Sequence, residues 1–505
     1  MIRLFASKLL VLCMAVLCLG PNIYAQHAKT KPQLDKSLIP SPVFEENEGY
    51  VELYWKAWEL AWEKVKYQEG IPQSPYMDEG LWDDTIWIWD TEFMVLFCRY
   101  AAQEYPGIES LQNFYKVLLD KEATSLRIQH PDNPPFYAWV EYEYYKFSND
   151  KDHLKQLIAK DKYLQRHYNW FENIKPGTKL HFKHAHIALE KREKGYKWGG
   201  VQSGMDNTPR DYNTKGKMLW VDAIAQQALS ALYISRLAKE IDEKAIAKEY
   251  QDRYQQLKDI VNENYWDEED GFYYDILETD GSFVKVKTPA SFWVLLAEIP
   301  SKKQAKRMAE YAFDPKHFGG DFPWPTLSKQ EPYFNKELGD YWKGAIWLPT
   351  AYMATKSLEK YGLNQLANQL SESLLNHMYK TYKQYTPHTI WECYSPSKPT
   401  PSFRVFGEET ERVREDFCGW SALGPISIFI ENVLGFYNVD AQKNEVHWNL
   451  HHKKRHGIKG LRFGKVKADI VYANGEINVQ SNEAFHLHVN GKKYKVHKGE
   501  NRFRF

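Results

Sequence analysis

The stretch Tyr50–Val65, YVELYWKAWELAWEKV, shows the pattern that dominates this chain of 505 residues. In it, Trp55, Trp58, Trp62 and Val65 recur at spacings of three and four, which place them on one face of an α-helix. Comparable helical patterns follow in residues 91–102, 111–119, 224–232, 341–361 and 419–431. The sequence therefore predicts a mainly α fold, with one helical region over residues 44–438.

After about Val439 the hydrophobic period changes from helical to two. Apolar residues alternate with polar ones in residues 466–472 and again in 485–496. The pairs Asn474-Gly475 and Asn490-Gly491 lie between alternating runs, and Asn-Gly in this position is a strong hairpin signal. We expect residues 439–505 to form a small C-terminal antiparallel β module.

The N-terminus has the pattern of a secretory signal peptide. Arg3 and Lys8 precede an apolar run over residues 9–19, and Ala25 follows at a suitable cleavage position. A membrane-spanning helix needs roughly 20 apolar residues, so this run is too short to serve as an anchor. We expect residues 1–25 to be removed, residues 26–43 to be a linker, and the protein to be exported, to the periplasm.

Charge and cysteine content exclude several classes of protein. Lys and Arg number 66, as do Asp and Glu, and no polybasic patch appears, so the sequence gives no support for nucleic-acid binding. Outside the signal only Cys98, Cys393 and Cys418 remain, too few for a disulfide scaffold, although one bridge from Cys393 to Cys418 is possible. Because no CxxC or HExxH spacing occurs, we predict no metal site and no cofactor.

Three loop motifs combine a carboxylate with aromatic residues or glycine. They are WIWDTEFM at 87–94, SGMDNTPR at 203–210 and WECYSP at 391–396. Glycoside hydrolysis needs one carboxylic acid to protonate the departing oxygen and a second carboxylate to activate water or attack carbon. Aromatic rings, which make up 15% of the chain, can cover the apolar faces of sugars. The motifs thus indicate a carbohydrate substrate.

In these motifs the chain resembles glycoside hydrolase family 63. Six blocks follow the order found in that family: WIWDTEFM, DNPP at 132–135, SGMDNTP, YWKGAIWLPT at 341–350, WECYSP, and FCGWSALGP at 417–425. The resemblance implies an (α/α)6 barrel and hydrolysis with inversion. It places the general acid at Asp206 and the general base at Glu392. It also implies these sugar-binding positions: Trp87, Trp89, Asp90, Asn133, Gly204, Tyr341, Trp342, Trp347 and Trp420.

Each of these residues also has a purely structural interpretation. Asp206 could be a turn residue, Glu392 a member of a buried ion pair, and Asp90 the cap of a helix that starts at Thr91. Trp347 and Trp420 begin helical patterns and could belong to the core. The charged stretch 408–416 is typical of a solvated loop.

The resemblance favours an exo-acting α-glucosidase that removes terminal α-linked glucose from oligosaccharides. Trehalase, or a hydrolase of α-mannosides or glucosylglycerate, is the nearest alternative. A polysaccharide lyase or a glycan-binding protein without turnover is a more distant one. In the DNPP block, Asn133 replaces the family's frequent Gln, so a probable sugar contact is one methylene shorter.

Overall fold

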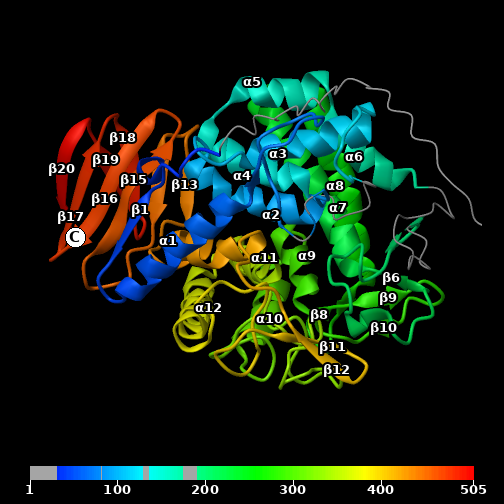
Figure 1. Cartoon of the computed structure of the whole chain (residues 1–505). Coiled ribbons are helices and arrows are strands. Elements are labelled where there is room, and N and C mark those ends of the chain that lie inside the picture. The colour runs from blue at the N-terminus through cyan, green and yellow to red at the C-terminus, as the bar shows by residue number, and fades with distance from the viewer. Residues whose placement is uncertain (1–30, 81, 83, 129–135, 175–189) are drawn as a thin grey trace, which may run out of the picture. The chain divides into compact units, whose positions relative to one another are not determined.

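Helices recur along the chain from Glu48 to Val433 (Figure 1). The computed structural model describes residues 31–80, 82, 84–128, 136–174 and 190–505. Residues 34–505 form one unit by their contacts. The signal predicted at residues 1–25 lies outside the described residues. Within the described part, no helix has both the length and the apolar character needed to cross a bilayer.

Some helical segments are buried on all sides, whereas others have one exposed face. Every residue of α2 (Ile88–Cys98) is buried, as is every residue of the π-helical segment η8 (Gly424–Val433). Most residues of α7 (Val221–Glu240) and α11 (Leu348–Glu359) are buried too. By contrast, α1 (Glu48–Glu63) buries one face, which includes Leu53, Ala57 and Trp58. A helix that is apolar all round belongs in a core and an amphipathic one at its surface. The helical prediction is confirmed; closure into an (α/α)6 barrel stays a prediction.

The remaining helices have these bounds: α3 Gly107–Phe114, α4 Tyr137–Ser148, α5 Lys151–Leu154, α6 Tyr163–Glu172, α8 Lys244–Asn264, α9 Trp293–Leu296, α10 Lys302–Phe313 and α12 Asn364–Gln384. Between them lie short strands: β2 Val65–Lys66 with β3 Tyr76–Met77, β4 Glu190–Arg192 with β5 Gly195–Lys197, β7 Trp266–Asp267 with β8 Phe272–Tyr273, β11 Phe403–Phe406 with β12 Glu409–Arg412, and the sheet of β6 Met218–Leu219, β9 Asp275–Leu277 and β10 Phe283–Val284.

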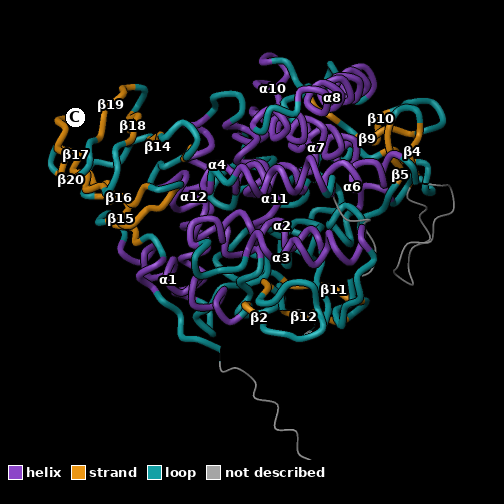
Figure 2. Tube along the Cα trace, turned by 90° about the horizontal axis from the view of Figure 1, so that it is seen from above, coloured by secondary structure: helices purple, strands orange, loops and turns teal. Residues whose placement is uncertain are grey.

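Two sheets follow the helical region and lie beside each other in Figure 2. One has the order β1-β15-β16-β17-β20 and the other β13-β14-β18-β19. Their strands are β1 Ser41–Phe44, β13 Asn438–Asp440, β14 Glu445–Trp448, β15 His456–Phe463, β16 Val466–Ala473, β17 Glu476–Ser481, β18 Phe485–Val489, β19 Lys492–Val496 and β20 Gly499–Arg504.

Both predicted hairpins are present. Asn474 and Gly475 have φ of 52° and 80°, and Asn490 and Gly491 have φ of 48° and 84°. Positive φ at both central residues is typical of a type I′ turn, whose twist suits the flanking strands.

Two features of these sheets differ from the prediction. β14 and β18 pair in parallel, so the module is not wholly antiparallel. The connection between these strands runs through β15, β16 and β17 of the other sheet, which allows a parallel pairing that a hairpin cannot make. In addition, residues 41–43, expected to end a linker, form β1 together with Phe44, and β1 pairs with β15. The Phe44 ring packs against Phe429, and this buried contact holds the segment in place.

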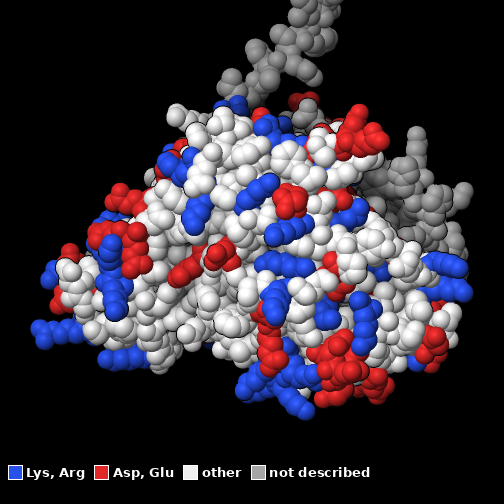
Figure 3. Space-filling view, turned by 90° about the horizontal axis from the view of Figure 1, so that it is seen from below, with Lys and Arg blue, Asp and Glu red and all other residues white. Residues whose placement is uncertain are grey.

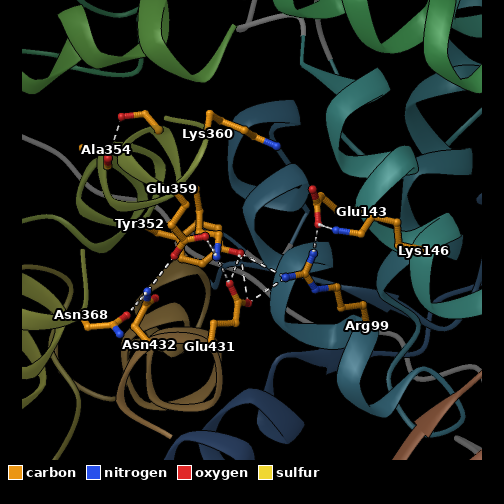
Figure 4. Close-up of polar contacts among 12 residues, drawn as sticks. Arg99, Glu143, Lys146, Tyr352, Ala354, Glu359, Lys360, Asn368, Glu431 and Asn432 are labelled. Atoms are coloured by element: carbon orange, nitrogen blue, oxygen red, sulfur yellow. Dashed lines mark hydrogen bonds and ion pairs between the residues drawn. The ribbon is translucent and has the colours of Figure 1, made fainter. Parts of the chain in front are cut away.

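A buried ionic network joins several of the helices (Figure 4). The Glu431 carboxylate on η8 accepts a hydrogen bond from Arg99 Nη2 at 2.7 Å and lies 2.7 Å from Lys356 Nζ. Arg99 also pairs with Glu143 of α4 at 2.8 Å. Burial opposes ionisation of Glu431, but Lys356 and Arg99 outweigh it and lower its pKa. Glu431 therefore lies between two buried cations, each of which also contacts a second carboxylate, Glu143 for Arg99 and Glu359 for Lys356.

We expect Glu431→Ala to reduce the free energy of unfolding by about 3 kcal/mol, because two buried cations each lose one of their two carboxylate partners, Arg99 keeping Glu143 and Lys356 keeping Glu359. Urea unfolding at neutral pH measures this. Lys36→Ala is the matched control, because it removes an ion pair with Glu59 in which both side chains are about half exposed. The control should change stability by less than about 1 kcal/mol. Similar losses in the two variants would contradict a stabilising role for the network.

Candidate active site

Residues from four separated stretches line one cavity of about 620 Å³. The stretches lie at 79–90, 201–207, 341–347 and 392–420. Of the predicted site residues, the following line it: Trp87, Trp89, Asp90, Gly204, Asp206, Tyr341, Trp342, Trp347, Glu392 and Trp420. Asn133 lies outside the described residues. The face seen from below in Figure 3 carries acidic and basic side chains in close mixture, consistent with the equal counts of the two signs.

Asp206 lies in a turn that projects its carboxyl into the cavity. The turn is closed by a hydrogen bond from the Met205 N–H to the Gly200 carbonyl. Asp206 lines the cavity and keeps contact with solvent, although many protein atoms surround its carboxyl. This desolvation raises the pKa of Asp206 to about 6; Arg404 opposes the shift and the Glu392 charge adds to it. The turn interpretation is therefore correct but incomplete, because the turn presents a carboxyl that can hold a proton near neutral pH.

Glu392 is almost fully buried and makes three polar contacts through its carboxylate. Oε1 accepts hydrogen bonds from the Tyr341 hydroxyl at 3.0 Å and from Arg414 Nη2 at 2.6 Å. Oε2 accepts one from the Arg414 backbone N–H at 3.2 Å. Glu392 is thus both a member of an ion pair and a wall of the cavity, so the two interpretations of this residue are compatible.

Sequence reasoning missed the cationic side chains of the site, which are those of Arg404, Arg412 and Arg414. The stretch 408–416, expected to be a solvated loop, contributes β12 and then Arg414, which contacts Glu392. Arg404, on β11, lies with its guanidinium 4.5 Å from the centre of the Tyr341 ring and lines the cavity beside Asp206. The solvated-loop prediction is wrong for Arg414. The apolar alternation of residues 403–406 before Gly407 was the signal for a hairpin there.

Asp90 does not cap a helix. Helix α2 begins at Ile88 with Trp87 as its N-cap, so Asp90 lies inside the first turn and its side chain lines the cavity. Burial, and then the nearby charge of Glu79, raise the pKa of Asp90 well above its usual value, against the effect of Arg414. A protonated carboxyl could donate a hydrogen bond to a sugar hydroxyl. Glu79, which also lines the cavity, was not predicted.

Gly204 lines the cavity and packs closely against Trp89. A Cβ at this position would lie 2.9 Å from two carbon atoms of the Trp89 indole, and the φ of Gly204 is +77°. The absent side chain therefore makes room for Trp89, and contact between Gly204 and a substrate stays a prediction. Trp89 is itself held from behind by Phe93 and Phe136.

Hydrogen bonds of Asn207 and stacked tryptophan rings form another wall of the cavity. Asn207, next to Asp206, accepts a hydrogen bond from the Trp342 N–H at 2.8 Å and donates one to the Asp340 carbonyl at 3.1 Å. Trp342 stacks on Trp347 with ring centres 4.1 Å apart. Trp347 and Trp420 are buried, as a core role requires, yet both reach the cavity.

The possible bridge between Cys393 and Cys418 is not formed. Both are buried free thiols, as is Cys98. Their side chains face different neighbours, since Cys393 lies against the Ser402 hydroxyl whereas Cys418 lies toward Lys64.

Solved structures of several glycosidases share this fold. A glycoside hydrolase family 63 mannosylglycerate hydrolase from Thermus thermophilus, crystallised with Tris, matches 74% of this chain and 99% of its own with a TM-score of 0.56 at 18% identity. A sialidase structure matches 92% of this chain with a TM-score of 0.66 at 15% identity, and this chain covers 40% of that one.

Comparison of sequences identifies further relatives and a matching family model. A protein described as a probable mannosyl-oligosaccharide glucosidase of Schizosaccharomyces pombe is 22% identical over 72% of this chain, which spans half of that protein's length. The mannosylglycerate hydrolase of Thermus thermophilus is 31% identical over 22% of this chain and 26% of its own. The family model of the mannosylglycerate hydrolase MGH1-like glycoside hydrolase domain matches residues 117–402, more than half of the chain. Together with the cavity and its two carboxyls, this shows that the chain belongs to that family, a branch of the glycoside hydrolases related to family 63.

Proposed function

We propose that this protein is an exported, exo-acting α-glucosidase that hydrolyses terminal α-linked glucose with inversion. The observation that carries the proposal is the meeting of Asp206 and Glu392 in one aromatic-walled cavity. The pKa of Asp206, about 6, suits a general acid. The pairing of Glu392 with Arg414 suits a carboxylate that works in its ionised form. The proposal includes closure of the helices into an (α/α)6 barrel around this site, and the signal-like residues 1–25 support export to the periplasm.

The two acids divide the reaction between them. Asp206 gives its proton to the glycosidic oxygen as the bond from that oxygen to the anomeric carbon breaks. Glu392 takes a proton from a water molecule while the water oxygen bonds to the anomeric carbon on the opposite face. The products are the free alcohol and a sugar of inverted configuration, leaving Asp206 ionised and Glu392 protonated until solvent restores both. Such a single displacement needs room for the water, and carboxyl groups roughly 6.5–9.5 Å apart provide it.

A second candidate substrate is an α-mannoside or α-glucoside whose aglycone carries a carboxylate, such as a glycosylglycerate. Arg404 favours it, since this cation lines the cavity beside Asp206 and forms no ion pair with any described residue. A guanidinium in that position could bind an aglycone carboxylate bidentately. The Thermus thermophilus mannosylglycerate hydrolase has also been crystallised with D-glycerate. A trehalase activity is a third possibility that the same assay addresses.

We expect neutral α-linked glucose disaccharides to be hydrolysed, with β-glucose as the first-formed anomer. A panel of these disaccharides, trehalose, mannosylglycerate and glucosylglycerate, followed by ¹H NMR, tests substrate and stereochemistry together. Arg404→Met distinguishes the candidates: it should leave KM for neutral glucosides within a few-fold but raise KM strongly if the true substrate is anionic. First formation of α-glucose would refute inversion, and preference for a glycosylglycerate would replace the first candidate by the second.

Asp206→Asn and Glu392→Gln should each lower kcat by about 10²–10⁴-fold, the usual contribution of a general acid or base. Glu411→Gln is the control, because its side chain also lines the cavity and carries a carboxylate but has no role in the proposed reaction. Circular dichroism checks that the variants fold. Activity near wild-type in either catalytic variant would remove that residue from the mechanism.

The pH dependence of kcat/KM should reflect the protonation of Asp206. Because the general acid must be protonated, kcat/KM should fall as the pH rises through about 6. The raised pKa also means that ionised Asp206 is less favourable in the folded than in the unfolded protein, a cost that appears as the pH rises from about 4 to about 6. Asp206→Asn should therefore be at least as stable as wild type at pH 7. Relief from the cost of ionising Asp206 should be absent at pH 4. A clear loss of stability at pH 7 would contradict this.

A further inference from the structure

Three metal-ligating side chains gather on the outer face of the sheet β13-β14-β18-β19, in residues that the proposed hydrolysis does not use. Glu445 and His447 are two positions apart on β14, so they project from the same face. His488 on β18 is the register partner of His447 in the parallel pair. Figure 2 shows β14 and β18 next to each other. The strand pairing itself therefore brings two imidazoles and one carboxylate together.

The donor atoms lie at distances that suit a shared ion. His447 Nε2 is 3.1 Å from Glu445 Oε1, and His488 Nε2 is 3.4 Å from Glu445 Oε2. One donor atom from each of the three residues lies within 4.8 Å of the others. Tetrahedral ligands at about 2.0–2.2 Å from zinc stand roughly 3.3–3.5 Å from one another. The two imidazole rings are stacked, with an angle of 7° between planes and 4.3 Å between centres, so one ring must rotate about its side-chain bonds for both nitrogens to face the same ion.

The nitrogen of His488 is available for a ligand. Its Nε2 atom is shielded from solvent and makes no hydrogen bond with any described residue, although Glu445 is near. The three side chains retain between 16% and 22% exposure, so an ion can reach the site from water.

A second cluster of two histidines and one glutamate differs in that its histidine nitrogens already have partners. It consists of Glu372, His451 and His452. There, His452 Nδ1 lies 2.6 Å from the Glu46 carboxylate and His452 Nε2 lies 2.9 Å from the Val433 carbonyl oxygen. Both nitrogens of His452 are thus occupied, and metal binding would break one of these hydrogen bonds.

We propose that His447, His488 and Glu445 bind a divalent transition-metal ion, zinc in the first instance. Imidazole and carboxylate are ordinary zinc ligands, and three protein ligands leave one tetrahedral position for water. The neighbouring charge of Lys493 and the imidazole of His486 act against a bound cation, so we expect micromolar rather than nanomolar affinity.

The position of the site suggests a structural role. β14 and β18 are separated in sequence by the whole of β15, β16 and β17. An ion bound across them would link two strands that no hairpin connects. Because it binds only the folded arrangement, zinc should raise Tm, and the stabilisation should grow with the logarithm of the free zinc concentration once that exceeds Kd.

The experiment uses the chain from residue 26, without a histidine tag. After removal of metals by chelation, Zn²⁺ is titrated against a chromophoric chelator, and bound zinc is counted by mass spectrometry after gel filtration. We expect one Zn²⁺ per chain at micromolar free zinc. His447→Ala and His488→Ala should each weaken binding at least tenfold and abolish the rise in Tm, with glycosidase activity unchanged.

His451→Ala is the matched control, since it removes a histidine of similar exposure from the second cluster. This variant should keep the ion and the rise in Tm. Absence of stoichiometric zinc in the wild-type chain would overturn the proposal. So would loss of the ion in His451→Ala together with its retention in both other variants.

Discussion

The ion pair between Glu392 and Arg414 is the contact on which the cavity depends. Arg414 donates to both carboxylate oxygens, once from its guanidinium and once from its backbone. The Glu392 backbone N–H donates in return to the Arg414 carbonyl. This exchange ties the segment after Trp391 to the one that leads into Trp420, whose indole N–H lies 3.5 Å from the Glu392 carbonyl. Since Tyr341 donates to the same carboxylate, three walls of the site meet at one side chain.

The same arrangement gives the Asp206 and Glu392 carboxyls different surroundings. Glu392 is out of solvent but surrounded by donors and a cation, which compensate its charge. Asp206 faces the cavity with desolvation as the strongest influence on its pKa and with Arg404 only partly compensating. The two carboxyls of the cavity therefore have different surroundings, Glu392 lying beside a cation and hydrogen-bond donors and Asp206 facing the cavity.

The abundance of aromatic residues serves two purposes in this fold. Trp58, Trp139 and Trp293 are fully buried without lining the cavity, so they belong to the core. Trp87 and Trp342 line the cavity and are placed there by their neighbours. Composition alone indicates a carbohydrate-binding surface for all of them equally, because ring content does not depend on position. Only packing separates the rings that fill the protein from those that can meet a sugar.

The sequence by itself determined the local structure and the principal acids. The spacing in Tyr50–Val65 determines a helix because apolar residues three and four apart share a face, and Asn490-Gly491 determines a turn because both residues tolerate positive φ. The motif containing Asp206 was recognisable because its residue types are contiguous. Tertiary structure alone decided the contribution of Arg414 and the pairing of β14 with β18, since each depends on segments that meet only in the folded chain. Contacts between distant segments leave no periodic pattern in the sequence, because the free energy that stabilises them comes from packing between separate elements.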